Sequence, residues 1–133
     1  MSGEKNLSRL LSQMDPKLNP GTYVFVSVDK LPNLDYQSVI GQFREAEGTT
    51  LILEREVAIA NGLSYDFVAS WITLQIHSSL EAIGLTAAFS HALAQGNISC
   101  NVISGYYHDH IFVKKEDESK ALEVLTALAK HPI

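Results

Sequence analysis

The chain has 133 residues, of which 46% are hydrophobic and 19% are charged, and its formal net charge is −5. A chain of this length and apolar content can bury the core of one compact domain, or of two small modules that share a core, and it lacks the high charge of a disordered protein. Its 10 lysines and arginines are scattered along an acidic sequence, which excludes a basic stripe for a phosphate backbone, so nucleic acid is not an expected partner.

The first half of the chain predicts two short helices and three strands. Apolar residues between Leu7 and Met14 recur at helical spacing and stop before a proline, as in a short amphipathic helix. A run of β-branched and aromatic residues after the turn signal at 19–21 indicates a strand, and two further runs flank a hairpin that contains a glycine. The predicted elements are a helix at 7–14, strands at 22–28, 39–44 and 49–54, and a helix at 56–62.

The second half predicts the order strand, helix, strand, strand, helix. This order is one strand short of the ferredoxin-like βαββαβ unit, so we expect the first half of the chain to complete the sheet. The helix is indicated by an apolar stripe formed by Leu85, Ala88, Phe89, Ala92 and Leu93. The predicted elements are a strand at 67–77, a helix at 85–95, strands at 98–104 and 109–114, and a closing helix around 121–129.

The two halves have similar lengths, and each contains a hairpin followed by a helix. An ancient duplication fits this organisation, although the residues themselves show no convincing repeat. We place the boundary between residues 1–64 and residues 65–133, and no proline-rich or glycine-rich linker surrounds Ser64-Tyr65. The lack of a linker predicts that the halves pack closely together.

The second half resembles an ACT domain, a small ligand-sensing module. The resemblance rests on Gly84-Leu85 at the start of the predicted helix and on Asn97-Ile98-Ser99 at the entry to the next strand, where asparagine replaces the usual glycine. Segments 43–51, 79–85 and 108–110 resemble a bacterial tandem-ACT family that is similar to the CASTOR-type arginine sensors. The resemblance implies an α+β fold of two ferredoxin-like ACT units (βαββαβ-type), with an antiparallel sheet and helices on one face.

The same resemblance implies a function and a site. The function is non-catalytic binding of an amino acid or similar small metabolite by a regulatory protein, with a homodimer as the default assembly and a protein partner to receive the signal. The site in ACT domains lies where the first strand gives way to the first helix, where free N–H groups favour a carboxylate and nearby acids would accept from an ammonium. The residues expected to bind the ligand are Ser78, Ser79, Leu80, Glu81, Ile83, Gly84, Leu85, Thr86, Asn101, Ser104, His108 and Asp109.

Other interpretations use the same residues. His108 and His110 alternate on one strand face, but further metal ligands at a recognisable spacing are missing, so neither a metal nor another cofactor is predicted. A hydrolase would need a nucleophile, yet no nucleophile motif surrounds Ser78 or Cys100, and Cys100 is expected to pack as a small hydrophobe. Ser78 with Glu81 also fits a capping box. The alternative of another class is an ACT-like protein-interaction module that has lost ligand binding.

A cytoplasmic location is expected. The single Cys100 has no cysteine with which to form an intramolecular disulfide, as is usual in a reducing compartment. The N-terminus lacks a basic segment followed by an apolar core, and no stretch approaches the roughly 20 apolar residues needed to span a bilayer. A membrane is therefore not an expected partner.

Overall fold

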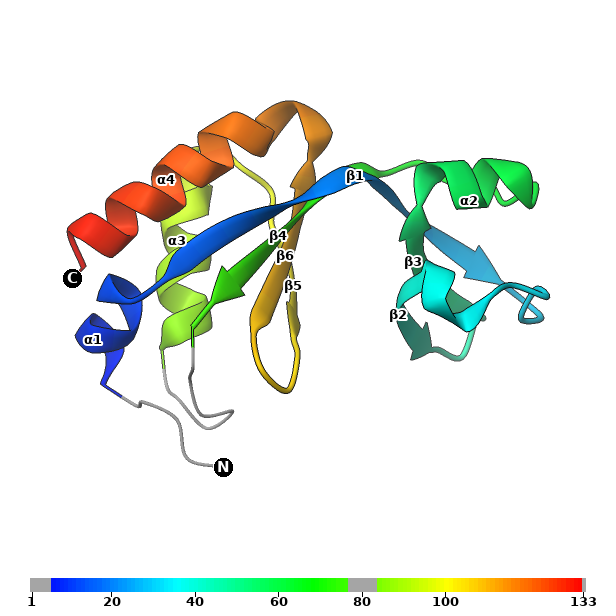
Figure 1. Ribbon diagram of the computed structural model, residues 1–133, viewed down its shortest axis with the longest axis horizontal. Coiled ribbons are helices and arrows are strands. Elements are labelled where there is room, and N and C mark those ends of the chain that lie inside the picture. The colour runs from blue at the N-terminus through cyan, green and yellow to red at the C-terminus, as the bar shows by residue number, and fades with distance from the viewer. Residues whose placement is uncertain (1–5, 77–83, 133) are drawn as a thin grey trace. The chain divides into compact units, whose positions relative to one another are not determined.

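The computed structural model of the chain describes residues 6–76 and 84–132 (Figure 1). The strands are β1 (Asp15–Val28), β2 (Val39–Arg44), β3 (Thr49–Glu54), β4 (Val68–Gln75), β5 (Asn101–Ser104) and β6 (Asp109–Lys114). The helices are α1 (Leu7–Ser12), α2 (Arg55–Ala60), α3 (Leu85–Gln95) and α4 (Glu118–Lys130), with short 3-10 helices η1 (Tyr36–Ser38) and η2 (Lys115–Asp117). Apart from β1, the helices α1 to α4 and the strands lie close to the positions that the sequence predicts.

The chain forms two compact units. Unit 1 comprises Met1–Pro20 together with Ser70–Ile133, and unit 2 comprises Gly21–Ala69. The strands β1 and β4 each cross this division, so each contributes residues to both units. The expected boundary between residues 64 and 65 concerns the two halves of the sequence and stays a prediction.

Unit 1 has the strand order β1-β4-β6-β5. The chain runs from β4 through α3 to the antiparallel pair β5 and β6 and then into α4, which is the predicted βαββα order. The first part of β1 lies beside β4 and supplies the missing strand. The expectation that the first half of the chain completes the sheet of the second is therefore confirmed.

Helices α1, α3 and α4 pack together over one face of the unit 1 sheet (Figure 1). The buried side chains between them include Leu10 and Leu11 of α1, Ile72 and Leu74 of β4, Phe89 and Leu93 of α3, Ile111 and Val113 of β6, and Leu125 of α4. Because side chains alternate along a strand, Trp71 and Thr73 of β4 and His110 and Phe112 of β6 belong to the opposite face of the sheet.

Strand β1 is longer than the sequence predicts, and the turn expected at 19–21 is wrong. The strand continues through Pro16 and Pro20 as far as Val28. Proline removes a backbone donor but is tolerated on an edge strand, and β3 pairs with β1 only beyond this first part. Gly21 has φ of 109°, which lets the backbone continue in a conformation that other residues rarely adopt.

Unit 2 has the strand order β2-β3-β1, and the first two residues of β4 lie on the other side of β1. Both β2–β3 and β1–β3 are antiparallel. The pairs Val24–Leu53 and Val26–Leu51 place apolar side chains in one buried cluster, which also contains Ala58 of α2. This is the ferredoxin-like strand order, but the segment 29–38 replaces the first helix and contains only η1.

The fold is therefore α+β, with antiparallel strand pairs arranged as two ferredoxin-like units, as predicted. The units differ in how their sheets are covered. Unit 1 has a full-length first helix in α3, whereas unit 2 has a loop in the corresponding place. Within the described ranges, no helix combines the length and the apolar character needed to cross a membrane.

Candidate functional site

The start of α3 forms the central part of the predicted site. Gly84 is the N-cap with φ of 88°, and its carbonyl accepts the first helical hydrogen bond from the Ala88 N–H at 2.9 Å. Gly84 lies close to α1, since a Cβ added to Gly84 would lie 3.4 Å from Cδ2 of Leu7. No described side chain caps the first-turn N–H groups, and no acidic residue lies in that turn. Among residues 6–76 and 84–132, the positive end of the helix dipole therefore has no side-chain acceptor.

The hairpin between β5 and β6 carries the second group of predicted residues. Ser104 pairs with Asp109, and the Gly105 N–H donates to the His108 carbonyl at 2.9 Å to close the turn. Nδ1 of His108 is buried and has no hydrogen-bond partner among the described residues. This hairpin therefore offers a carboxylate, a hydroxyl and an unsatisfied ring nitrogen within a few residues.

The hairpin and the start of α3 lie at the same end of unit 1, the lower end in Figure 1. Val102 packs against the core under the helices, so alternation assigns Ser104 and its partner Asp109 to the same face as α3. Asn101 belongs to the opposite face and stands at the other end of β5. Ser104 and Asp109 therefore share the sheet face that α3 covers and the end of unit 1 at which α3 begins, whereas Asn101 lies on the opposite face.

Several predicted residues lie outside the described part of the chain. They are Ser78, Ser79, Leu80, Glu81 and Ile83. The capping-box interpretation of Ser78 and Glu81 falls there too. Of the predicted residues that are described, Leu85 is buried in the core and Thr86 is exposed on α3.

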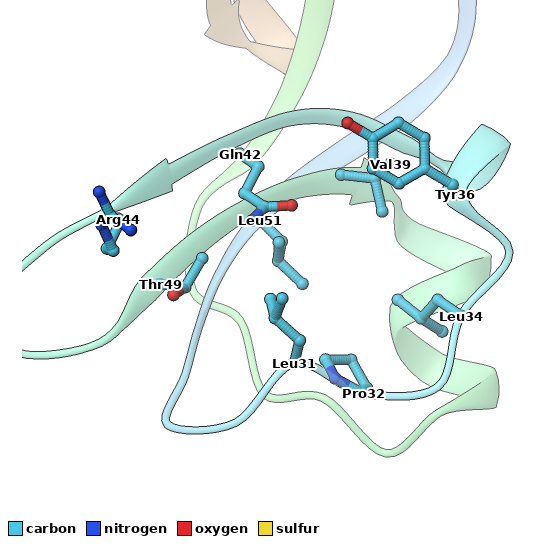
Figure 2. Close-up of a pocket in the computed structure, with 9 residues that line it drawn as sticks. All are labelled: Leu31, Pro32, Leu34, Tyr36, Val39, Gln42, Arg44, Thr49 and Leu51. Atoms are coloured by element: carbon cyan, nitrogen blue, oxygen red, sulfur yellow. The ribbon is translucent and has the colours of Figure 1, made fainter.

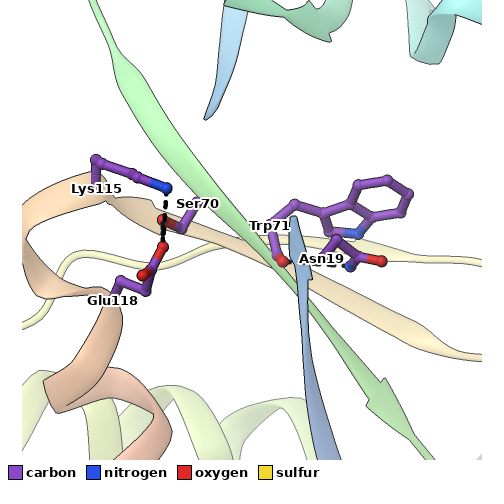
Figure 3. Close-up of polar contacts among 5 residues, drawn as sticks. All are labelled: Asn19, Ser70, Trp71, Lys115 and Glu118. Carbon is purple, nitrogen blue, oxygen red and sulfur yellow. Dashed lines mark hydrogen bonds and ion pairs between the residues drawn. The ribbon is translucent and has the colours of Figure 1, made fainter. Parts of the chain in front are cut away.

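The opposite face of the unit 1 sheet carries a polar and aromatic cluster that the sequence does not predict as a site. The Trp71 indole N–H donates to Nδ1 of His110 at 3.0 Å, and Oγ1 of Thr73 lies 3.2 Å from the same nitrogen. The Asn19 amide donates to the Trp71 carbonyl at 3.2 Å (Figure 3). The same amide donates to Thr73 Oγ1 at 2.9 Å. Trp71 also stacks on Phe112, with ring centroids 6.2 Å apart. Burial and the neighbouring His108 lower the pKa of His110, while Asp109 opposes them.

A second polar contact joins β4 to the start of α4. The buried Ser70 hydroxyl donates to a Glu118 carboxylate oxygen at 2.6 Å, and the Lys115 ammonium lies 3.0 Å from the same oxygen (Figure 3). These two hydrogen bonds lower the pKa of Glu118. The Ser70 hydroxyl and the Lys115 ammonium thus both contact Glu118 within unit 1. This arrangement explains local stability rather than ligand binding.

Unit 2 contains a groove that the sequence reasoning missed. It has a volume of about 630 Å³ and lies between the loop after β1 and the strands β2 and β3 (Figure 2). Its lining residues are Leu31, Pro32, Leu34, Tyr36, Val39, Gln42, Arg44, Thr49 and Leu51. A signal was available in the sequence, because the segment between two predicted strands is too short for the helix that a ferredoxin-like unit has there.

The enzyme and metal interpretations gain no geometric support. Cys100 packs beside the buried core of unit 1, and burial raises the pKa of its thiol to about 11. A thiol of that pKa is a poor nucleophile at neutral pH. Over residues 6–76 and 84–132, no group of three or more histidine, cysteine, aspartate and glutamate residues is arranged to hold a metal ion.

Comparisons with known proteins agree with this architecture. A Vibrio cholerae protein of unknown function, described as a possible transport protein, is 51% identical, with a TM-score of 0.83 over 94% of this chain and 97% of that one. A Porphyromonas gingivalis protein, described as a possible C-terminal regulatory domain of aspartate kinase, is 18% identical, with a TM-score of 0.58 over 86% of this chain and 95% of that one. The regulatory subunit of aspartate kinase from Thermus thermophilus is 9% identical, with a TM-score of 0.57 over 84% and 95%.

Family-level comparison covers nearly the whole chain. No curated protein sequence matches it. Residues 2–70 match one ACT domain family model, and residues 67–127 match a second. The aspartate kinase relatives share the fold at low identity, while the family models identify both parts of the sequence. The chain therefore belongs to the ACT domain family, of which it carries two members in tandem.

Proposed function

We propose that this tandem ACT protein is a non-catalytic sensor that binds an amino acid or a similar small metabolite at the start of α3. ACT domains are regulatory modules, and this chain resembles regulatory parts of aspartate kinase in fold. The observation that carries the proposal is the first turn of α3, which begins at a glycine with φ of 88° and which no described side chain caps. Glycine leaves room for close backbone approach, and free N–H groups attract a carboxylate.

The hairpin residues supply what a zwitterionic ligand needs at its other charge. The Asp109 carboxylate would accept from the ligand ammonium, and the Ser104 hydroxyl would add a polar contact. A site with backbone donors for the carboxylate and one acid for the ammonium matches both charges of an amino acid. Regulation would follow if the ligand favours one assembly or partner complex over another, with a coupling of about 1–3 kcal/mol. We propose a homodimer as the assembly.

A thermal-shift screen of the purified protein against the 20 common amino acids tests the proposal. A ligand at 100 times its dissociation constant should stabilise the fold by about 2.7 kcal/mol, which is a clear shift of the melting temperature. The best ligand is then measured by calorimetry on Asp109→Asn, for which we expect at least a tenfold weaker affinity. Glu123→Gln serves as the matched control, because Glu123 is exposed on α4.

Two results would argue against this function. The first is the lack of a shift with every amino acid in a protein that melts cooperatively. The second is an equal loss of affinity in Asp109→Asn and Glu123→Gln, which would point to a general charge effect. Gly84→Val is a further variant, and it is informative only if its circular dichroism spectrum matches that of the parent protein.

The alternative function is a protein-interaction module without a ligand. One observation favours it: Tyr106 and Tyr107 at the tip of the β5–β6 hairpin are 62% and 64% exposed. Their rings pack edge to face with centroids 5.0 Å apart. Exposed tyrosines often anchor protein interfaces. Under this alternative, no amino acid shifts the melting temperature, and Tyr107→Ser abolishes binding to the partner while the fold is unchanged.

A further inference from the structure

The groove of unit 2 occupies the place where unit 1 has α3. In both units one β-strand is followed by a connection to the outer strand of a hairpin, and only in unit 1 does that connection form a full helix. The cross-strand pairs Gln42–Leu51 and Arg44–Thr49 line the groove in unit 2. Because paired residues share a sheet face, Gln42, Arg44 and Thr49 lie on the same face as Leu51. Leu51 belongs to the buried cluster that also contains Ala58 of α2.

The groove has an apolar part and a polar end. In Figure 2, Arg44 and Thr49 lie towards one end, and Leu34 and Tyr36 lie towards the other, with Leu31 and Leu51 between them. Among the described residues that line the groove, Arg44 is the one with a charged side chain. An apolar cavity with a few polar groups at one side is the usual form of a small-molecule site.

The guanidinium of Arg44 is available for an anion. Its side chain makes no ion pair or hydrogen bond with any residue in the described part of the chain. The carboxylate of the neighbouring Glu45 accepts a hydrogen bond from the Thr50 hydroxyl, and among the described residues it forms no ion pair with Arg44. Thr50 follows Thr49 along β3 and therefore belongs to the opposite face of the strand pair.

We propose that this groove binds a small molecule with one carboxylate and an apolar body. The carboxylate pairs with Arg44, where a planar guanidinium can donate two parallel hydrogen bonds, and Thr49 and Gln42 supply further polar groups. The apolar body lies against Leu31, Leu34 and Leu51. This site belongs to unit 2 and is independent of the amino acid site proposed for unit 1.

Calorimetry with three probes of equal carbon skeleton tests the proposal. The probes are 4-methylpentanoate, 4-methyl-1-pentanol and 4-methylpentylamine, which differ only in the head group. We expect the carboxylate to bind and the alcohol and amine to bind at least tenfold more weakly. Arg44→Ala should weaken 4-methylpentanoate at least tenfold. Arg55→Ala is the matched control, because Arg55 is exposed in the same unit but does not line the groove.

Amide shifts in two-dimensional NMR locate the bound probe. The expected result is that 4-methylpentanoate shifts the amides of Gln42, Thr49 and Leu51, and that Asp109→Asn leaves its affinity unchanged. The proposal is overturned if the carboxylate does not bind, if the alcohol binds equally well, or if Arg44→Ala and Arg55→Ala behave alike. Because Asp109→Asn addresses unit 1 and Arg44→Ala addresses unit 2, failure of either proposal leaves the other intact.

Discussion

The hairpins of the two units are more alike than their sequences. Strands β3 and β6 have the same length and the same succession of two half-buried, three buried and one exposed residue. The turn before β3 is closed by the Glu45 N–H and the Gly48 carbonyl at 2.8 Å, and the turn before β6 by Gly105 and His108 at 2.9 Å. A structural repeat is therefore present where the residues themselves show no convincing one.

The units differ in the connection that leaves the first strand. In unit 1, α3 buries Phe89 and Leu93 against the sheet, whereas in unit 2 the loop 29–38 leaves a groove. The polar pair at the hairpin end also changes, from Ser104 and Asp109 in unit 1 to Arg44 and Thr49 in unit 2. The acidic group of this pair lies on the inner strand β6 in unit 1, whereas the basic group lies on the outer strand β2 in unit 2.

We expect the largest change in the free energy of unfolding from a substitution in α3, and little change from a substitution in the loop 29–38 of unit 2. Phe89→Ala removes a fully buried ring and should lower the free energy of unfolding by about 3–5 kcal/mol. Leu31→Ala, in the loop at 59% exposure, should change it by less than about 0.5 kcal/mol. Urea denaturation followed by circular dichroism measures both. Similar losses in the two variants would contradict the distinction between helix and loop.

The next effect concerns the contact that joins β4 to α4 in unit 1. Ser70→Ala leaves a Glu118 oxygen without its hydroxyl donor and should lower the free energy of unfolding by about 1.5 kcal/mol. This value is at the lower end for hydrogen bonds to charged groups, because Glu118 is partly exposed. The folded-state pKa of Glu118 lies below its ordinary value of 4.5, so this stability is present above that pH and is lost as pH falls through the folded pKa.

The measurement for this contact is urea denaturation at neutral and at acidic pH. Ser70→Ala should be destabilised at neutral pH and should lose less stability than the parent protein on acidification. Equal acid sensitivity in the two proteins would mean that the hydroxyl does not lower the pKa of Glu118.

A third effect comes from the opposite face of the same sheet. His110 accepts from the Trp71 indole N–H through Nδ1, a contact that a proton on Nδ1 would abolish and that contributes about 1 kcal/mol. Its folded-state pKa lies below the ordinary 6.5, so the unfolded chain takes up a proton first as pH falls. The contribution of His110 to the free energy of unfolding should be greatest above pH 6.5 and should decrease as the pH falls from 6.5 to the folded-state pKa.

His110→Asn provides the test, since its side-chain oxygen can replace Nδ1 as acceptor but does not titrate. Its stability should vary less with pH below 6.5 than that of the parent protein. His91→Asn is the control, because His91 is exposed on α3 and takes no part in the contact between Trp71 and His110. If both variants flatten the profile, another group is responsible for the pH dependence.

The smallest effect is expected from Lys115. Its ammonium and the Glu118 carboxylate form an i,i+3 pair at 3.0 Å with both side chains partly exposed. Lys115→Ala should therefore cost only about 0.3–0.5 kcal/mol, and less at high salt. Denaturation at low and high ionic strength measures this, and a loss as large as that of Ser70→Ala would show that the ion pair, rather than the hydroxyl, dominates the contact.

The sequence predicted the elements well where one physical signal dominated. The apolar stripe of α3 fits the helical period, and β3 and β6 each contain a continuous apolar run next to a hairpin turn, so their positions followed directly. The length of β1 was not predictable in this way, because Pro20 and Gly21 are turn signals. Only the position of this segment beside β4 shows that it is a strand and not a turn. Local patterns carry no information on such long-range pairing.

The candidate sites show the same limit. The start of α3 was predictable from Gly84 and Leu85. Alternation alone separates Asn101 from Ser104, but which of the two shares the face of α3 follows only from the packing of Val102 against the core. The unit 2 groove was missed because Gln42 and Arg44 look like ordinary exposed strand residues. Their role emerges only from the register that sets Arg44 opposite Thr49, next to the place of the missing helix.

A two-dimensional NMR titration of the protein with the amino acid that gives the largest thermal shift shows whether the ligand binds at the start of α3. We expect saturable shifts of the Leu85, Thr86 and Ala87 amides at the start of α3, together with those of Ser104 and Asp109 in the hairpin. Saturating amino acid that leaves these amides unmoved, or that shifts only residues elsewhere in the chain, would contradict binding at this site.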